Sequence, residues 1–303
     1  MPPTTLYNGF CGSRVQTEGL PPGTWPWLVS IQLPEVDGDG YRHWCGGTLI
    51  NSRWVLSAAH CFGLKRYIKV KFWRVVVGIT QLLEEDPEAQ IVYIERLVEH
   101  ENYNRIGYLN DIALIELNRS VVCNDRIQLA CLPDSSLSIS QLSHCYFTGW
   151  GSTHANKNIM KLEIMQEVKV SLLDTAACNS SRWYFKRIRD NNLCALPETG
   201  SKEACQGAGG GPLMCWEGRS ERFWVVGINS WWSGCTEIRM PSVFISTQRF
   251  ASWILRVTRE ADTRAQAHGL VQARVQAEFQ LGSAELHALG AAAAANSATG
   301  NFR

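Results

Sequence analysis

Short apolar runs separated by turn residues fill most of this 303-residue chain. Four of them are Trp27–Leu33, Trp54–Ser57, Arg74–Val77 and Phe223–Ile228. They are rich in β-branched and aromatic residues and alternate with glycine-bearing turns, a pattern typical of strands. Few stretches repeat with the period of about 3.6 residues that marks an amphipathic helix. The sequence therefore predicts an all-β fold, either a sandwich or a barrel.

One helix is expected to close this β region. It is predicted to start near Thr247, and residues spaced three and four apart build its apolar face. These residues are Phe250, Trp253, Ile254 and Val257. The composition then shifts to Ala, Gln, Arg and Gly, with too few large apolar residues for a core. Residues 260–303 are therefore predicted to be a low-complexity, disordered tail.

The composition disfavours several classes of function. The chain carries 29 Lys and Arg against 28 Asp and Glu, so its net charge of +1 favours neither nucleic acid nor an anionic membrane. No apolar stretch reaches the roughly 18 residues of a membrane span. The first residues, Met1–Phe10, lack the basic and apolar regions of a signal peptide, which we interpret as a truncated start.

The 11 cysteines indicate an oxidising compartment. Most lie in strand-like or loop contexts rather than in Cys-x-x-Cys pairs, which favours a disulfide framework over zinc ribbons. Their odd number leaves one thiol without an intrachain partner. No cofactor is predicted.

Two segments carry side chains that serine catalysis requires. His60 lies in Ser57–Cys61, and Asp111 precedes the apolar run Ile112–Ile115. A buried Asp that accepts the imidazole N–H fixes the tautomer, so that the other nitrogen can take a proton from a hydroxyl. Taken alone, each motif is more often structural, a core histidine or a turn before a strand. Together with the glycine-rich run Cys205–Leu213, in this order along the chain, they form a strong signal.

At these residues the sequence resembles the chymotrypsin-like serine proteases, and acrosin-type members most closely. The likeness covers about residues 11–257 and is clearest in His43–Leu56, Cys178–Tyr184 and Gly211–Cys215. It implies two six-stranded antiparallel Greek-key β-barrels with a C-terminal α-helix and an active cleft between the barrels. It also implies three parts: a light-chain-like segment of residues 1–14, a protease-like domain of residues 15–259, and the tail of residues 260–303.

The nucleophile loop departs from the family pattern. Gly209 stands at the serine position, so His60 has no hydroxyl to activate and covalent catalysis is lost. The resemblance still assigns an oxyanion hole to Gly207 and Gly209. Ala208 replaces the aspartate that anchors the activated N-terminus, and Arg14–Glu18 stands where the family has Arg-Ile-Val-Gly-Gly. Both halves of that ion pair are therefore expected to be absent.

The specificity pocket also departs from the pattern. The resemblance places Glu203 at the floor, where trypsin-like relatives use Asp to bind Arg or Lys of the substrate. Trp232 and Ser242 replace glycines of the pocket wall. We therefore expect a narrowed or closed pocket.

The resemblance implies five disulfides. The pairs are Cys45–Cys61, Cys145–Cys215, Cys178–Cys194, Cys205–Cys235 and Cys11–Cys131. Cys123 is left over, because Tyr7 falls where acrosin-like chains place its light-chain partner.

Two basic segments suggest an anion-binding surface. Lys65–Arg74 alternates basic and apolar residues, so that Lys65, Lys69 and Lys71 would share one face of a strand. Lys186–Arg189 could extend this face into a site for sulfated glycans or phosphates. A solvated strand face without a ligand is the alternative.

Three further motifs are short. Asn118 and Asn179 each begin an N-glycosylation tripeptide. Glu84–Glu88 resembles a calcium loop, but Ile79 stands where such loops tend to start with an acid, so no metal site is predicted.

Three interpretations remain open. The first is an inactive, secreted or acrosomal serine protease homologue that acts as a binding scaffold for protein or glycan partners, such as egg-coat glycoproteins. The second is a trypsin-like endopeptidase that cleaves after Arg or Lys. The third is a degraded gene without a stable product.

Overall fold

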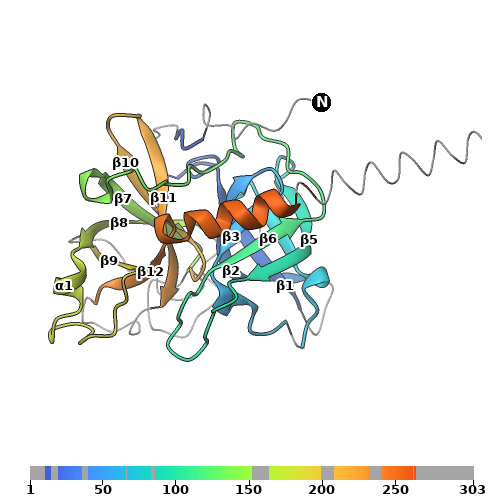
Figure 1. Ribbon diagram of the computed structural model, residues 1–303. Helices are drawn as coiled ribbons and strands as arrows, with labels where there is room; N and C mark the ends of the chain where they lie inside the picture. The colour runs from blue at the N-terminus through green and yellow to red at the C-terminus, as the bar shows by residue number, and fades with distance from the viewer. Residues whose placement is uncertain are drawn as a thin grey trace, which may run out of the picture. The chain divides into compact units, whose positions relative to one another are not determined.

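The computed structural model describes residues 11–14, 20–35, 40–65, 67–82, 86–151, 164–198, 208–231, 240–261 and 263. Its strands form two closed antiparallel barrels of six strands each (Figure 1). The prediction of an all-β, two-barrel fold is therefore confirmed.

The first barrel has the strand order β1-β2-β3-β6-β5-β4. Its strands are β1 (Leu28–Pro34), β2 (Tyr41–Asn51), β3 (Trp54–Ser57), β4 (Arg74–Val77), β5 (Gln90–Glu99) and β6 (Ala113–Leu117). In β5, Val92 and Ile94 are buried, whereas Ile91 and Tyr93 are exposed. This alternation is what a strand with one core face produces. The barrel interior is thus encoded in the two-residue period of the apolar runs.

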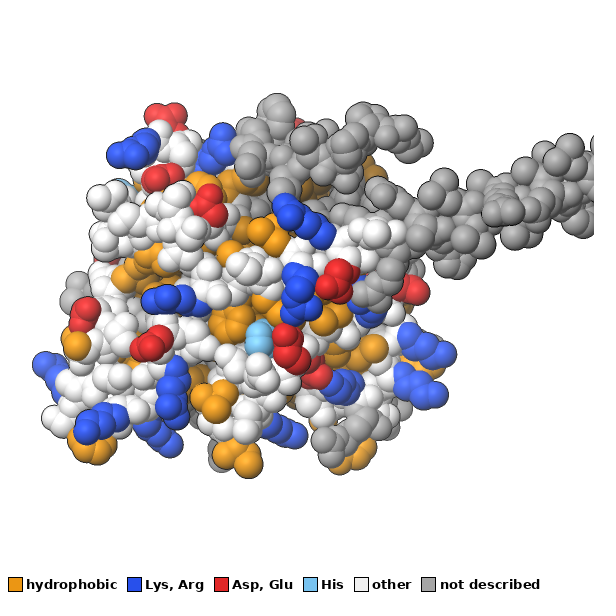
Figure 2. Space-filling model, in the orientation of Figure 1, with side chains coloured by type: hydrophobic (Ala, Val, Ile, Leu, Met, Phe, Trp, Pro, Cys, Tyr) orange, Lys and Arg blue, Asp and Glu red, His pale blue; other side chains and the backbone are white. Residues whose placement is uncertain are grey.

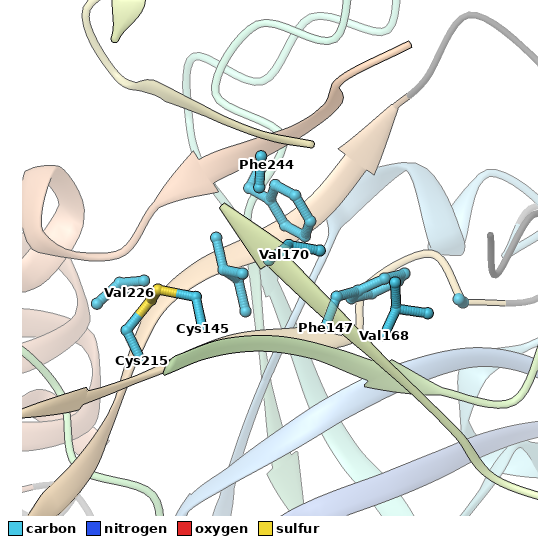
Figure 3. Close-up of a cluster of buried hydrophobic side chains, with 10 residues drawn as sticks. Cys145, Phe147, Val168, Val170, Cys215, Val226 and Phe244 are labelled. Atoms are coloured by element: carbon cyan, nitrogen blue, oxygen red, sulfur yellow. A yellow bond between two sulfur atoms is a disulfide. The ribbon is translucent and has the colours of Figure 1, made fainter. Parts of the chain in front are cut away.

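The second barrel has the strand order β10-β11-β12-β9-β8-β7. Its strands are β7 (Ser143–Gly149), β8 (Gln166–Leu173), β9 (Asn192–Pro197), β10 (Pro212–Glu217), β11 (Arg222–Trp231) and β12 (Ser242–Ser246). Phe147, Val168, Val170 and Phe244 fill its core beside a disulfide (Figure 3). Ala208 belongs to the same buried cluster and is fully shielded from solvent.

Helices are few and short in the described residues. The helix α1 (Thr175–Cys178) is capped by Asp174, whose carboxylate accepts hydrogen bonds from Ala176 N and Ala177 N at 2.8 and 3.3 Å. A 3₁₀ turn at Gln248–Phe250 leads into a helix over residues 251–261. The helix predicted to start near Thr247 is therefore confirmed. None of the helices described here has the length and apolar character needed to cross a membrane.

Contacts divide the chain into two compact units, residues 1–251 and residues 252–303. Both barrels lie in the first unit. Residues 264–303 lie outside the described residues, so the disordered tail remains a prediction.

The strand expected over Lys65–Arg74 is wrong except at its last residue. A 3₁₀ turn (η2, Val70–Phe72) occupies the segment, and β4 begins only at Arg74. Local bonds such as Phe72 N to Lys69 O, 3.0 Å, hold these turns. Trp73 is fully buried and stacks on Phe62 with ring centroids 5.3 Å apart. The burial of Trp73 therefore determines the path of this segment, in spite of its alternating basic and apolar residues. Lys65 forms an ion pair with Glu99.

Disulfides tie the framework together as expected. Among the described residues four bonds are present: Cys11–Cys131, Cys45–Cys61, Cys145–Cys215 and Cys178–Cys194. Each removes conformational freedom from the unfolded chain and typically contributes about 2 to 4 kcal/mol. Cys205 and Cys235, the fifth expected pair, lie outside the described residues.

Cys123 is exposed and carries a free thiol. We expect intact, non-reduced protein that is denatured in iodoacetamide to gain a single carbamidomethyl group, located at Cys123 by peptide mapping. Three modified cysteines would instead show that Cys205 and Cys235 do not pair. A Cys123→Ser variant supplies the control and should gain none.

Candidate active site

His60 and Asp111 come together as the sequence predicts. His60 lies in a 3₁₀ turn after β3 (η1, Ala59–Phe62), and Asp111 lies just before β6. The Asp111 side chain is fully buried and accepts hydrogen bonds from His60 Nδ1 and from His60 N, both at 2.7 Å. Because the carboxylate accepts, Nδ1 carries the proton and neutral His60 keeps Nε2 as a proton acceptor. The pair therefore has the arrangement of a general base.

Ser230 completes this network, and the sequence motifs did not identify it. The hydroxyl of Ser230, in β11, donates to Asp111 Oδ2 at 2.5 Å. Ser230 comes from the second barrel, 119 positions after Asp111, so no local spacing could have revealed the contact. Three hydrogen-bond donors thus surround the buried carboxylate and hold it in place beside His60.

Two tyrosines lie beside the pair. Tyr108 meets the His60 ring edge-on, with centroids 5.8 Å apart. Burial and then the negative charge of Asp111 raise the pKa of Tyr103 above its ordinary value. Both belong to the loop before β6, where Gly107, Tyr108 and Asn110 all have positive φ. At the two non-glycine residues, Tyr108 and Asn110, this loop holds a strained backbone close to His60, as functional sites often do.

The loop Ala208–Gly211 is fixed to both barrels. In the second barrel, Asn229 donates through Nδ2 to Ala208 O at 3.1 Å and accepts from Gly210 N at 2.8 Å. In the first barrel, Gly46 N donates to Gly209 O at 2.8 Å. Gly210 has a φ of +78°, and a Cβ there would collide with Ser57 Oγ and with the carbonyl oxygen of Gly46. The loop is thus built for glycine and held rigidly.

Gly209 faces the free nitrogen of His60. A Cβ atom on Gly209 would lie 2.8 Å from His60 Nε2 and 3.3 Å from His60 Cε1. Cys61 Sγ, half of a disulfide, lies 3.7 Å from the same nitrogen. The first side-chain atom of any other residue at position 209 would therefore lie next to the basic nitrogen of His60. Glycine has no side chain there.

The sequence model of the trypsin family matches residues 14–254. The chain belongs to the trypsin family. Transmembrane protease serine 5 of Homo sapiens is 34% identical to it over 250 residues, which are 80% of this chain and 52% of that relative. The chain thus spans about half the length of this trypsin-family relative.

Ala208 lies where trypsin-family members are expected to carry an aspartate. It is fully buried in the apolar core of the second barrel, and a Cβ on Gly149 would come within 3.4 Å of its methyl group. An ionised side chain here would need a buried partner. The alanine instead fits the hydrocarbon surroundings.

The predicted pocket residues are only partly described. Glu203, Gly207 and Trp232 lie outside the described residues, and their roles remain predictions. Ser242 starts β12, is partly exposed and pairs with Ala195 of β9. It therefore lies in the second barrel, and its role in the pocket wall remains a prediction.

The two glycosylation tripeptides differ in their surroundings. Asn118 is exposed and uses its side-chain oxygen to accept from Tyr93 N at 3.0 Å. Asn179 is partly buried, and its amide bonds both Ile188 N and Ile188 O, at 2.8 and 2.9 Å. Asn118 is therefore the more accessible acceptor in the folded chain.

The acidic segment near residue 86 already pairs with a basic side chain. Arg126 forms ion pairs with Asp86 at 2.7 Å and with Glu88 at 2.6 Å. A calcium ion would have to compete with this guanidinium for both carboxylates. Glu84 and Glu85 lie outside the described residues.

Proposed function

We propose that this chain is a catalytically inactive member of the trypsin family that acts as a binding scaffold. One observation carries the proposal: the backbone of Gly209 faces His60 Nε2, and glycine brings no hydroxyl to that position. Loss of the nucleophile in a serine protease typically lowers turnover about 10⁶-fold. The base remains and has nothing to activate.

Ala208 supports the same proposal independently. In active relatives, as the resemblance implies, an aspartate at this position fixes the loop by pairing with a newly formed N-terminus. Ala208 has no charge to offer and is packed in an apolar core. Two adjacent residues therefore each remove a different requirement for catalysis. Glu203, Trp232 and Ser242, if they narrow the pocket as expected, would remove a third.

A trypsin-like endopeptidase that cleaves after Arg or Lys is the alternative. The intact network of His60, Asp111 and Ser230 favours it, because this network has no evident use without proteolysis. The rate of hydrolysis of an arginyl chromogenic peptide distinguishes the two functions. The scaffold predicts a rate about 10⁶-fold below that of an active trypsin-family enzyme. A rate that His60→Ala abolishes would support the endopeptidase.

The proposed partners are glycoproteins or sulfated glycans. Exposed cations follow α1 at Arg182, Lys186, Arg187 and Arg189, and Lys and Arg side chains gather along the lower left edge in Figure 2. Asn191 Nδ2 donates to Asn110 Oδ1 at 2.9 Å, which ties this segment to the loop carrying Arg105. A Cβ on Gly63 would lie 3.7 Å from Arg105 Cζ, so Arg105 lies against the turn that follows His60.

Such a surface would bind sulfate groups through guanidinium forks. The acrosin-like segments suggest a secreted or acrosomal setting and egg-coat glycoproteins as partners. The disulfide framework fits a secreted protein.

Heparin chromatography tests the glycan partner. We expect the protein to elute from heparin at higher salt than from a sulfopropyl resin, because an arranged cluster binds sulfates better than net charge does. Lys186→Glu combined with Arg187→Glu should remove the difference. Arg219→Glu combined with Arg222→Glu makes the same charge change near the β10–β11 turn and should leave the difference in place. Equal elution of wild type from both resins contradicts the glycan proposal.

A further inference from the structure

Arg14 lies in a built site for its guanidinium group. Its Cζ atom lies 4.2 Å from the ring centroid of Trp25, 5.4 Å from that of Tyr146 and 5.9 Å from that of Phe223. Its Nη2 atom forms an ion pair with Glu167 Oε2 at 2.9 Å. Three aromatic rings and one carboxylate therefore surround the Arg14 guanidinium. Most arginines instead remain hydrated at the protein surface.

Trp25 also positions the carboxylate of Glu167. Trp25 Nε1 donates to the same Glu167 Oε2 at 2.7 Å. The side chains of Arg14 and Glu167 are only 12% and 21% exposed. Cation–π contacts strengthen as water is excluded, and a partly buried ion pair is screened less by salt than an exposed one.

The backbone before Arg14 is fixed to β11 and to the segment between β6 and β7. Gly12 N donates to Leu129 O and Phe223 N donates to Gly12 O, both at 3.0 Å. The Cys11–Cys131 disulfide adds a covalent link. Gly12 has a φ of +74°, and a Cβ there would collide with the Phe223 carbonyl oxygen. The segment leading to Arg14 is therefore held in one path across the second barrel.

We propose that this guanidinium site withholds the peptide bond after Arg14 from trypsin-like proteases, so that the folded protein stays a single chain. Such a protease must draw the arginine side chain into its own specificity pocket before it cleaves. Arg14 must first leave the three rings and Glu167. The rate of cleavage then depends on the small population of molecules in which Arg14 has left its site. We expect this rate to be on the order of ten- to a hundredfold below the rate at an exposed arginine. The proposal holds whether or not the chain is itself an enzyme.

Limited digestion of the full-length protein with trypsin tests this proposal. A cut after Arg14 leaves the N-terminal piece attached through Cys11–Cys131, so it shows only on reducing gels and as a new N-terminus at Val15. In wild type this terminus should form at least tenfold more slowly than in Glu167→Gln or in Arg14→Lys. Lysine keeps the trypsin cleavage site and loses the planar group that stacks on the rings.

A matched control separates the site from a general loss of charge. Glu198→Gln removes an exposed partner of Lys169, 3.0 Å away, and should leave cleavage after Arg14 as slow as in wild type. Equal rates in wild type, Glu167→Gln and Arg14→Lys, whether all fast or all slow, overturn the proposal. So does a Glu198→Gln protein that is cleaved as fast as Glu167→Gln.

Discussion

Gly209→Ser is expected to react with fluorophosphonates, whereas we expect the wild-type chain not to react. The new Oγ would start from a Cβ placed 2.8 Å from His60 Nε2, so the ring must move back by a few tenths of an ångström to accept it. The Asp111 carboxylate already orients that ring at 2.7 Å. We expect labelling at position 209 to rise at least a hundredfold over wild type, read by intact mass and peptide mapping.

The His60→Ala change within the Gly209→Ser protein is the control, because it removes the base and keeps the hydroxyl. Labelling should fall back to the wild-type level. Peptide hydrolysis by Gly209→Ser should stay far below that of active relatives, since Ala208 still has no charge with which to fix the loop. A folded Gly209→Ser protein that does not label would contradict the role given to His60.

Gly210→Ala is expected to lower the free energy of unfolding by about 3 to 5 kcal/mol. Two causes add. The positive φ of +78° disfavours any L side chain, and the methyl group would collide with Ser57 Oγ and the Gly46 carbonyl oxygen. Urea unfolding at pH 7 measures the change in the free energy of unfolding.

Gly107→Ala isolates the backbone part of this effect. Gly107 has a φ of +83°, and a Cβ there would meet no atom within 4 Å. Strain alone should cost about 1 kcal/mol. If both variants lose the same stability, the close approach of the 208–211 loop to β2 and β3 does not exist in solution.

The sequence predicted the barrels better than the connections between them. In β5 and β8, alternation of buried and exposed residues such as Val168 and Lys169 follows directly from strand geometry. The segment over Lys65–Arg74 shows the same alternation and is not a strand before Arg74. There, Trp73 packing on Phe62 decides the path, and that contact is tertiary.

The site residues also differ in whether the sequence could predict them. His60 and Asp111 could be predicted because each lies in a recognisable local motif. Ser230 could not be, since its partner is 119 residues away. Arg14 could not be assigned to its aromatic site either, because Trp25, Tyr146 and Phe223 lie far apart in the sequence and converge only in the folded chain.

Ala208 and Gly209 are adjacent in the loop that faces His60. Both positions are well packed, one against the apolar core and one beneath His60. A scaffold that keeps its disulfides and its loop geometry while losing its hydroxyl can still present loops and cations to a partner.

The most direct measurement is fluorophosphonate labelling of the purified wild-type protein, read by intact mass. The inactive scaffold predicts no adduct under conditions in which an active trypsin-family enzyme labels completely. One adduct per chain that disappears in His60→Ala would contradict it, because the chain would then hold an activated nucleophile in spite of Gly209.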